Sequence, residues 1–218
     1  MKSPTQKTSI MQKQLKAMFE LQDAMNTRVK KDWRQQNFEW YRAIWIECGE
    51  LMDHYGWKWW KHQSPDYEQV KLELIDIWHF GLSILLEESI EISTVLIAIE
   101  KAFNSDKASD FREALEDFTE FTLAEKKFSI PLYTSLLKSV EMNFDDLYCG
   151  YVGKNVLNFF RQDHGYQDGT YQKTWDDRED NEHLVELMAQ VDHSDDQFSS
   201  KLYALLKERY QASIEKGL

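Results

Sequence analysis

Helix-breaking residues are scarce along this chain, and that scarcity limits the folds open to it. Only three prolines and eight glycines interrupt 218 residues, whereas a protein built of many short strands needs frequent turns at such residues. Apolar side chains also recur at helical intervals, since Leu15, Met18, Leu21 and Met25 follow one another at steps of three and four. The sequence therefore predicts an all-α fold.

Helical patterns cover most of the chain. The predicted helices span residues 14–26, 40–52, 67–87 and 147–161, and one or two closing helices span 182–216. Pro65 marks a break after the tryptophan-rich segment, and Ser64 or Asp66 can cap the helix that follows. Residues 91–145 also look helical, with acidic patches typical of a solvated outer layer. We see no convincing series of strands.

Length and composition predict one folded domain, residues 1–218, either as a single unit or as a core with a smaller cap. Aromatic residues make up 14% of the chain and include eight tryptophans, which argues against disorder. The net charge of −12 argues against a nucleic-acid partner, because such proteins carry a basic face. Anionic ligands would have to be attracted by metal ions or by a local cluster of lysine and arginine.

The cysteines and the apolar stretches indicate a cytoplasmic protein. Cys48 and Cys149 are too few for a disulfide framework, so free thiols in a reducing compartment are expected. The N-terminal segment lacks the apolar core of a signal peptide. The most apolar stretch, residues 74–86, is interrupted by polar side chains and is too short to cross a bilayer. No membrane partner is expected.

Two pairs of carboxylates stand out, Glu47-x-x-Glu50 and Glu73-x-x-Asp76. A spacing of three places both members of each pair on one helical face, and the intervening residues allow the second helix to return antiparallel to the first. Large apolar residues surround both pairs. An ionised carboxylate held against an apolar layer without a partner costs several kcal/mol. Basic side chains, protons or divalent metal ions must therefore compensate these charges.

Magnesium, with manganese as a possible substitute, suits such a set of hard oxygen ligands with few histidines. The basic residues nearby in sequence are not placed to serve all four carboxylates. A di-iron site would need two Glu-x-x-His units, and the region offers a single Asp76-x-x-His79. The other alternative is an ordinary acidic surface, because the pattern Glu-x-x-Glu is common in helices.

A basic face is predicted further along the chain. Lys154, Asn158 and Arg161 are separated by four and three residues and share one side of a helix. Lysine and arginine there can bind phosphate oxygens, and asparagine can pair with a base or a sugar hydroxyl. A glycine-containing loop with Tyr166 follows, and Lys173 lies beyond it. The alternative is a helix end whose basic residues complement the helix dipole.

Two amide side chains lie one turn apart near the N-terminus, Gln22 and Asn26. Amides offer a donor and an acceptor together, so they can read the edge of a pyrimidine. Exposed amides are common in helices, so this pair alone indicates little.

Together these segments resemble the dimeric, all-α dUTPase family. The blocks that carry the resemblance occur in order between residues 21 and 175: LQDAMN, ECGELMD, GWKWWK, LELIDIWHF and KNVLNFFRQDHGY. The resemblance implies a helical bundle with a rigid metal-binding core, roughly residues 10–103 and 147–175. It also implies a mobile helical cap, roughly residues 104–146 and 176–218, and a homodimer with composite active sites.

The implied activity is magnesium-dependent hydrolysis of dUTP to dUMP and pyrophosphate, and of dUDP to dUMP and phosphate. Such an enzyme limits uracil incorporation into DNA and supplies dUMP. A related all-α pyrophosphohydrolase acting on dCTP or on a modified nucleotide is the alternative enzyme. A third hypothesis is a helical interaction module whose carboxylates form only a solvated acidic face.

The resemblance also implies roles for individual residues. The metal ligands and catalytic residues would be Glu47, Glu50, Glu73 and Asp76, with Glu47 as the group that orients and deprotonates water. Contacts to uracil and deoxyribose would come from Gln22, Asn26, Trp59, His79 and Phe80. Closure over the phosphates or the base would involve Lys154, Asn158, Arg161, Tyr166 and Lys173. Among the three tryptophans of GWKWWK we choose Trp59, and His79 could instead be a packed core histidine.

Overall fold

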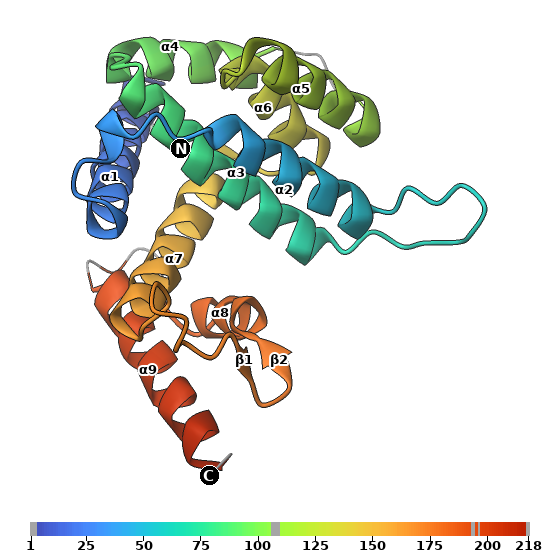
Figure 1. Cartoon of the computed structure of the whole chain (residues 1–218). Coiled ribbons are helices and arrows are strands. Elements are labelled where there is room, and N and C mark those ends of the chain that lie inside the picture. The colour runs from blue at the N-terminus through green and yellow to red at the C-terminus, as the bar shows by residue number, and fades with distance from the viewer. Residues whose placement is uncertain (1–3, 106–109, 193–194, 196, 217–218) are drawn as a thin grey trace.

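The fold is all-α, as predicted, apart from one small hairpin (Figure 1). The computed structural model describes residues 4–105, 110–192, 195 and 197–216. Its helices are α1 Pro4–Val29, α2 Trp40–Tyr55, α3 Tyr67–Glu87, α4 Ile92–Phe103, α5 Phe111–Glu125, α6 Ile130–Ser139, α7 Phe144–Asp163, α8 Asp180–Met188 and α9 Phe198–Lys216. A short 3-10 helix, η1, spans Trp33–Gln35, and strands β1 Thr174–Trp175 and β2 Arg178–Glu179 form the hairpin.

Capping residues set the ends of the two helices that matter most for the site. The backbone N–H of Gln69 donates to Asp66 Oδ1 at 3.2 Å, so α3 begins at Tyr67 as the sequence predicts. A capping box joins Asn143 and Asp146, so α7 begins three residues earlier than predicted.

Helices α2 and α3 lie side by side and antiparallel, joined by a long loop that extends away from the body of the protein (Figure 1). Helices α4, α5 and α6 pack together along one side of this pair. Helix α7 packs against α1 and α3. The hairpin, α8 and α9 follow it in the chain, and α8 and α9 also pack on α7. The range 91–145 thus contains the expected helices as α4, α5 and α6. The range 182–216 contains most of α8 and the whole of α9, so the closing helices are two.

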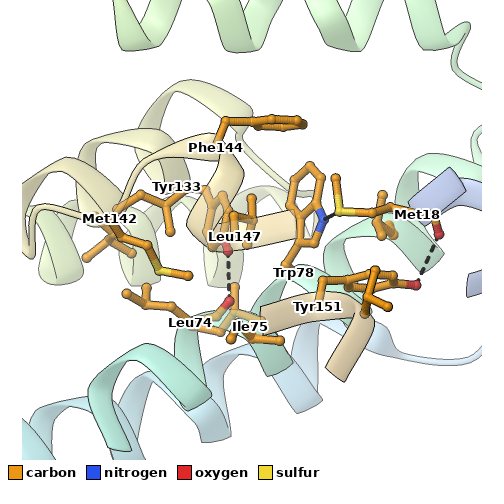
Figure 2. Close-up of a cluster of buried hydrophobic side chains, with 14 of the residues drawn as sticks. Met18, Leu74, Ile75, Trp78, Tyr133, Met142, Phe144, Leu147 and Tyr151 are labelled. Carbon is orange, nitrogen blue, oxygen red and sulfur yellow. Dashed lines mark hydrogen bonds between the residues drawn. The ribbon is translucent and has the colours of Figure 1, made fainter. Parts of the chain in front are cut away.

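Trp78 of α3 lies at the centre of the core (Figure 2). Its indole N–H donates to Met18 Sδ of α1 at 3.3 Å, and its ring stacks on Tyr133 of α6. Two tyrosine hydroxyls also find backbone partners. Tyr133 donates to the carbonyl of Leu74 at 2.8 Å, and Tyr151 of α7 donates to that of Met18 at 3.0 Å. These buried hydrogen bonds fix α1, α6 and α7 around α3.

Two elements were not predicted from the sequence, the short helix η1 and the β1–β2 hairpin. The two-residue turn of the hairpin, Asp176 and Asp177, has positive φ at both positions, 45° and 64°, as a type I′ turn requires. Two residues per strand give no readable alternation. In the described part of the chain, no helix is long and apolar enough to span a membrane. The division into a rigid core and a mobile cap stays a prediction.

Candidate active site

Three carboxylates from α2 and α3 converge on one point. Glu47, Glu73 and Asp76 each offer an oxygen atom, and these atoms all lie within 4.8 Å of one another. The spacing of three brings Glu73 and Asp76 to one face of α3, and the antiparallel packing of α2 brings Glu47 opposite them. Glu50 is more exposed, and it lines the same cavity of about 590 Å³. We call this cavity the acidic cavity.

Two carboxyl groups of the acidic cavity, those of Glu47 and Glu73, have raised pKa values. Burial, followed by the charge of Asp76 and a hydrogen bond with Glu73, raises the pKa of Glu47 to about 9. Burial and then the charge of Asp76 also raise the pKa of Glu73. Without a metal ion, this cluster of carboxylates therefore keeps a proton at neutral pH that ordinary glutamates would have lost. A divalent cation bound to the same oxygens would take the place of that proton.

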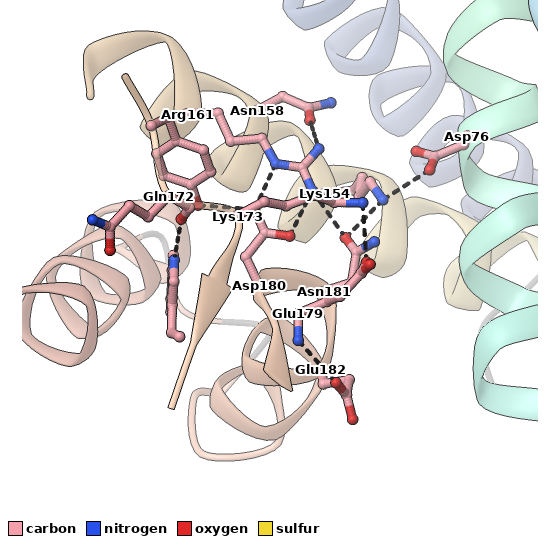
Figure 3. A network of polar contacts seen from close by, with 12 residues as sticks. Asp76, Lys154, Asn158, Arg161, Gln172, Lys173, Glu179, Asp180, Asn181 and Glu182 are labelled. Carbon is pink, nitrogen blue, oxygen red and sulfur yellow. Dashed lines mark hydrogen bonds and ion pairs between the residues drawn. The ribbon is translucent and has the colours of Figure 1, made fainter. Parts of the chain in front are cut away.

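One lysine already compensates part of this charge. Lys154 of α7 is 2% exposed, and its ammonium lies 2.8 Å from Asp76 Oδ2. It also donates to Asn181 Oδ1 at 2.9 Å, so it bridges α3 and the start of α8 (Figure 3). His54 Nε2 lies 3.8 Å from Glu73 Oε1.

Arg161 of α7 forms a two-pronged ion pair with Asp180, the first residue of α8 (Figure 3). The two N···O distances are 2.8 and 2.7 Å, and the hydroxyl of Tyr171 donates to the same carboxylate at 2.8 Å. Burial would raise the pKa of Asp180, which is 0% exposed, but the hydrogen bond and charge of Arg161 lower it. Arg161 also donates to Asn158 Oδ1 at 3.3 Å, and Lys173 pairs with Glu179 at 3.0 Å.

A second pocket of about 390 Å³ adjoins the acidic cavity. Both spaces are lined by Glu47, Asp76, Lys154, Arg161 and Tyr166. The walls of the second pocket are largely aromatic, formed by Trp33, Phe38, Trp40, Phe80 and Tyr166. We call it the aromatic pocket. Its size and walls suit one planar ring with its sugar.

The floor of the aromatic pocket is a set of neutral polar groups. His79 Nδ1 lies 2.7 Å from Gln22 Oε1, and because that oxygen can only accept, Nδ1 carries the proton. Burial lowers the pKa of His79 to about 4. Gln22 Nε2 donates to Asn26 Oδ1 at 2.9 Å, and the ring of Tyr151 stacks on His79. His79 is therefore a neutral group with a fixed tautomer.

The structure brings the predicted residues together with one exception. Gln22, Asn26, His79, Phe80 and Asn158 line the aromatic pocket, Glu50, Glu73 and Lys173 line the acidic cavity, and the five shared residues join the two spaces. Trp59 lines neither, because it lies in the loop between α2 and α3 and is 90% exposed.

Several residues of the site were not predicted. Asp180 forms the ion pair with Arg161, and Asn181 accepts the hydrogen bond from Lys154. Both residues begin α8 directly after the hairpin, and the hairpin, which was not predicted, places them next to α7. Three wall residues were also missed: Trp33 lies in η1, Phe38 lies in the connection from η1 to α2, and Trp40 is the first residue of α2. Their aromatic density was the available signal, but they show no helical period.

The fold and the site together are those of the all-α nucleotide hydrolases. The protein is helical, and it combines clustered carboxylates, a buried basic face and an aromatic pocket. The family model described as dUTPase matches residues 14–166, which is more than half of the chain. The chain therefore belongs to the dUTPase family and is a dUTP diphosphatase. A search of the curated proteins gives no match.

Proposed function

We propose that this protein uses Mg²⁺, or Mn²⁺ in its place, to hydrolyse dUTP to dUMP and pyrophosphate and dUDP to dUMP and phosphate. The observation that carries the proposal is the junction of the two spaces, where five residues line both. A nucleoside in the aromatic pocket places its phosphates among carboxylates and basic side chains. This activity would limit uracil incorporation into DNA and supply dUMP in the cytoplasm.

The ligands that we propose for the metal are Glu47, Glu50, Glu73 and Asp76. The clustered oxygens and the raised pKa values of Glu47 and Glu73 support a divalent cation there. Without a metal, protonation reduces the negative charge of the cluster, and a bound cation would reduce it in the same way. Bound Mg²⁺ would neutralise phosphate charge and lower the pKa of a coordinated water.

In the proposed reaction, Glu47 holds a water molecule and takes its proton. The water oxygen forms a bond to the β phosphorus, and the bond from that phosphorus to the α–β bridging oxygen breaks. The electron pair stays on the bridging oxygen, so dUMP leaves. Attack at the β phosphorus explains both substrates, because dUDP and dUTP share it. Lys154 and Arg161 would bind the phosphate oxygens, with Asn158, Tyr166 and Lys173 closing over the ligand.

For the base, we propose that the ring lies between the aromatic walls, with Phe80 and His79 against the uracil and deoxyribose. Asn26 and Gln22 lie at the floor of the same pocket. The neutral state of His79 supports a neutral ligand at this end, because a protonated imidazole would add charge to an apolar space.

We further propose a homodimer with composite active sites. Trp57, Trp59 and Trp60 are 46%, 90% and 57% exposed, and on α2 Trp45 and Ile46 are 41% and 47% exposed. Within the loop, Trp60 contacts both Trp57 and Trp59 edge-to-face, and exposed apolar side chains gathered in this way mark an interaction surface. The loop that carries Trp59 extends from the protein (Figure 1), so Trp59 would contact the base bound by the partner subunit.

One assay tests the proposed function. The purified protein is incubated with Mg²⁺ and each of the four dNTPs, dUTP, dUDP and UTP, and the release of pyrophosphate and phosphate is followed. We expect turnover of dUTP and dUDP and weak or no turnover of the others. Preference for dCTP would refute the uracil assignment, and equal activity in the presence of EDTA would refute the metal.

A further inference from the structure

Gln22 cannot read a base in the arrangement observed, because its amide has no hydrogen-bonding capacity left. Its nitrogen donates to Asn26 Oδ1 at 2.9 Å and to Ser83 Oγ at 3.1 Å. Its oxygen accepts from His79 Nδ1 at 2.7 Å and from the Tyr151 hydroxyl, whose single proton is shared between this oxygen and the Met18 carbonyl, both at 3.0 Å. A side-chain amide has two donors and two acceptor sites, and all four are used. Gln22 therefore positions other groups.

Ser83 sets the direction of this network. Its hydroxyl is 0% exposed and donates to the backbone carbonyl of His79, one turn earlier on α3, at 3.0 Å. Its oxygen accepts from Gln22 Nε2 and from Asn26 Nδ2, the latter at 2.9 Å. If either amide turned over, an amide oxygen would face a hydroxyl oxygen whose single proton is already used. Two oxygen atoms about 3 Å apart without a shared proton repel each other.

Asn26 is the amide that keeps capacity for a ligand. One N–H of Asn26 goes to Ser83 and one acceptor site goes to Gln22, so one N–H and one acceptor site remain. Asn26 lines the aromatic pocket, whereas Ser83 and Tyr151 do not. The fixed orientation of this amide decides which base it fits.

Uracil and cytosine present opposite patterns on the edge in question. Uracil offers a donor at N3 next to an acceptor at O4, and cytosine offers an acceptor at N3 next to a donor at N4. An amide that matches one edge must exchange its oxygen and nitrogen to match the other. On the basis of the proposed function, we propose that Ser83, directly and through Gln22, and Tyr151, through Gln22, hold Asn26 in the orientation that accepts from uracil N3–H and donates to uracil O4. They are positioning residues for base selectivity.

The test compares wild type with Ser83→Ala and Tyr151→Phe, using kcat/KM for dUTP and for dCTP. Ser83→Ala removes the acceptor that both amides need, so Asn26 can turn over. We expect the dUTP to dCTP ratio to fall at least about tenfold, which is ~1.4 kcal/mol. Tyr151→Phe keeps the ring and the bond from His79 to Gln22, so a fall of about threefold is expected.

The control is Thr134→Val, which removes a buried hydroxyl that makes the same kind of bond to a carbonyl one turn earlier, at 2.8 Å, away from both spaces. We expect this variant to keep the wild-type ratio, and thermal denaturation reports on folding in each case. Ratios within twofold of wild type in both Ser83→Ala and Tyr151→Phe would overturn the proposal.

Binding of dUMP and dCMP, measured by calorimetry, separates this proposal from the proposed function. A wild-type protein that hydrolyses no nucleotide but prefers dUMP in a Ser83-dependent manner would refute hydrolysis alone. A protein that hydrolyses dUTP but binds dUMP and dCMP equally tightly would refute the role of Asn26 alone.

Discussion

The acidic cavity and the aromatic pocket satisfy their polar groups in opposite ways. In the aromatic pocket, the amide of Gln22 makes all its hydrogen bonds within the protein, and His79 is neutral. In the acidic cavity, Glu47, Glu73 and Asp76 lie close together, and Lys154 forms an ion pair with just one of them. The aromatic pocket thus offers neutral polar groups that are already hydrogen-bonded within the protein, whereas the acidic cavity holds carboxylates whose charge the proposed divalent cation would compensate.

The largest expected effect comes from removing one carboxylate of the acidic cavity. We expect Glu73→Gln to lower kcat/KM for dUTP by at least about 10²–10³-fold, because it removes a proposed metal ligand. The metal-free variant should be as stable as wild type or more so, since the raised pKa of Glu73 shows that its charge is unfavourable there.

Thermal denaturation and steady-state kinetics measure these two outcomes. The matched control is Glu68→Gln on the same helix, an exposed residue whose partner is Lys71. Near wild-type activity in Glu73→Gln would show that Glu73 is not needed for the metal, and a much lower melting temperature would show that its charge supports the fold.

Arg161 gives the next largest effect, because it serves both the fold and the site. Arg161→Ala leaves Asp180 buried without its partner, which typically costs about 3–5 kcal/mol of stability. The double variant Arg161→Met, Asp180→Leu replaces both charges by apolar groups and should recover most of that loss in urea denaturation. It should not recover dUTP hydrolysis. Recovery of both would mean that Arg161 has only a structural role.

The residues proposed to bind the metal and those that surround the basic face could be predicted from the sequence to different degrees. The Glu47 and Glu73 pairs lie in helices whose apolar period is a local signal, and Asp66 caps the second of these helices, so α3 and its carboxylates were predicted with correct bounds. Asp180 depends on a hairpin of two-residue strands, and its contact with Arg161 spans 19 residues. Long-range pairing of this kind leaves no periodic pattern in the sequence.

The role of Ser83 was hidden for a similar reason. A serine inside an apolar helix usually bonds to its own backbone, and Ser83 does so. Its two further bonds exist because α1 packs on α3. Trp59 is a different case. Its assignment to the base rested on the family resemblance, and the structure leaves it 90% exposed and outside both spaces.

The pH dependence of stability should differ between the two spaces. Glu47 loses its proton near pH 4.5 in the unfolded chain but at about 9 in the metal-free folded protein. The folded state keeps a proton that the unfolded state has lost, so this stabilising contribution is full below pH 4.5 and declines as pH rises to 9. We expect a loss on the order of 2 kcal/mol, allowing for partial exposure.

His79 acts in the opposite direction. Its pKa is 6.5 when unfolded and about 4 when folded, so its contribution is full above pH 6.5 and is lost as pH falls toward 4. Urea denaturation of metal-free protein between pH 4 and 9 measures both limbs. Glu47→Gln should flatten the alkaline limb and leave the acid limb unchanged. An unchanged alkaline limb in this variant would show that Glu47 does not hold the proton.

The smallest effect on stability is expected at Trp59, and it tests whether the aromatic pocket is complete within one subunit. Trp59 is 90% exposed, so Trp59→Ala should change the free energy of unfolding by less than about 0.5 kcal/mol. If the partner subunit supplies this ring to the base, KM for dUTP should rise several-fold, because base–aromatic stacking is worth about 1–3 kcal/mol. Ile97→Ala on α4, which removes an apolar side chain that is 65% exposed and lines neither space, is the control, and sedimentation measures the dimer. A Trp59→Ala protein that stays dimeric and keeps its KM would assign the stacking to the walls of Trp33, Phe38 and Trp40 alone.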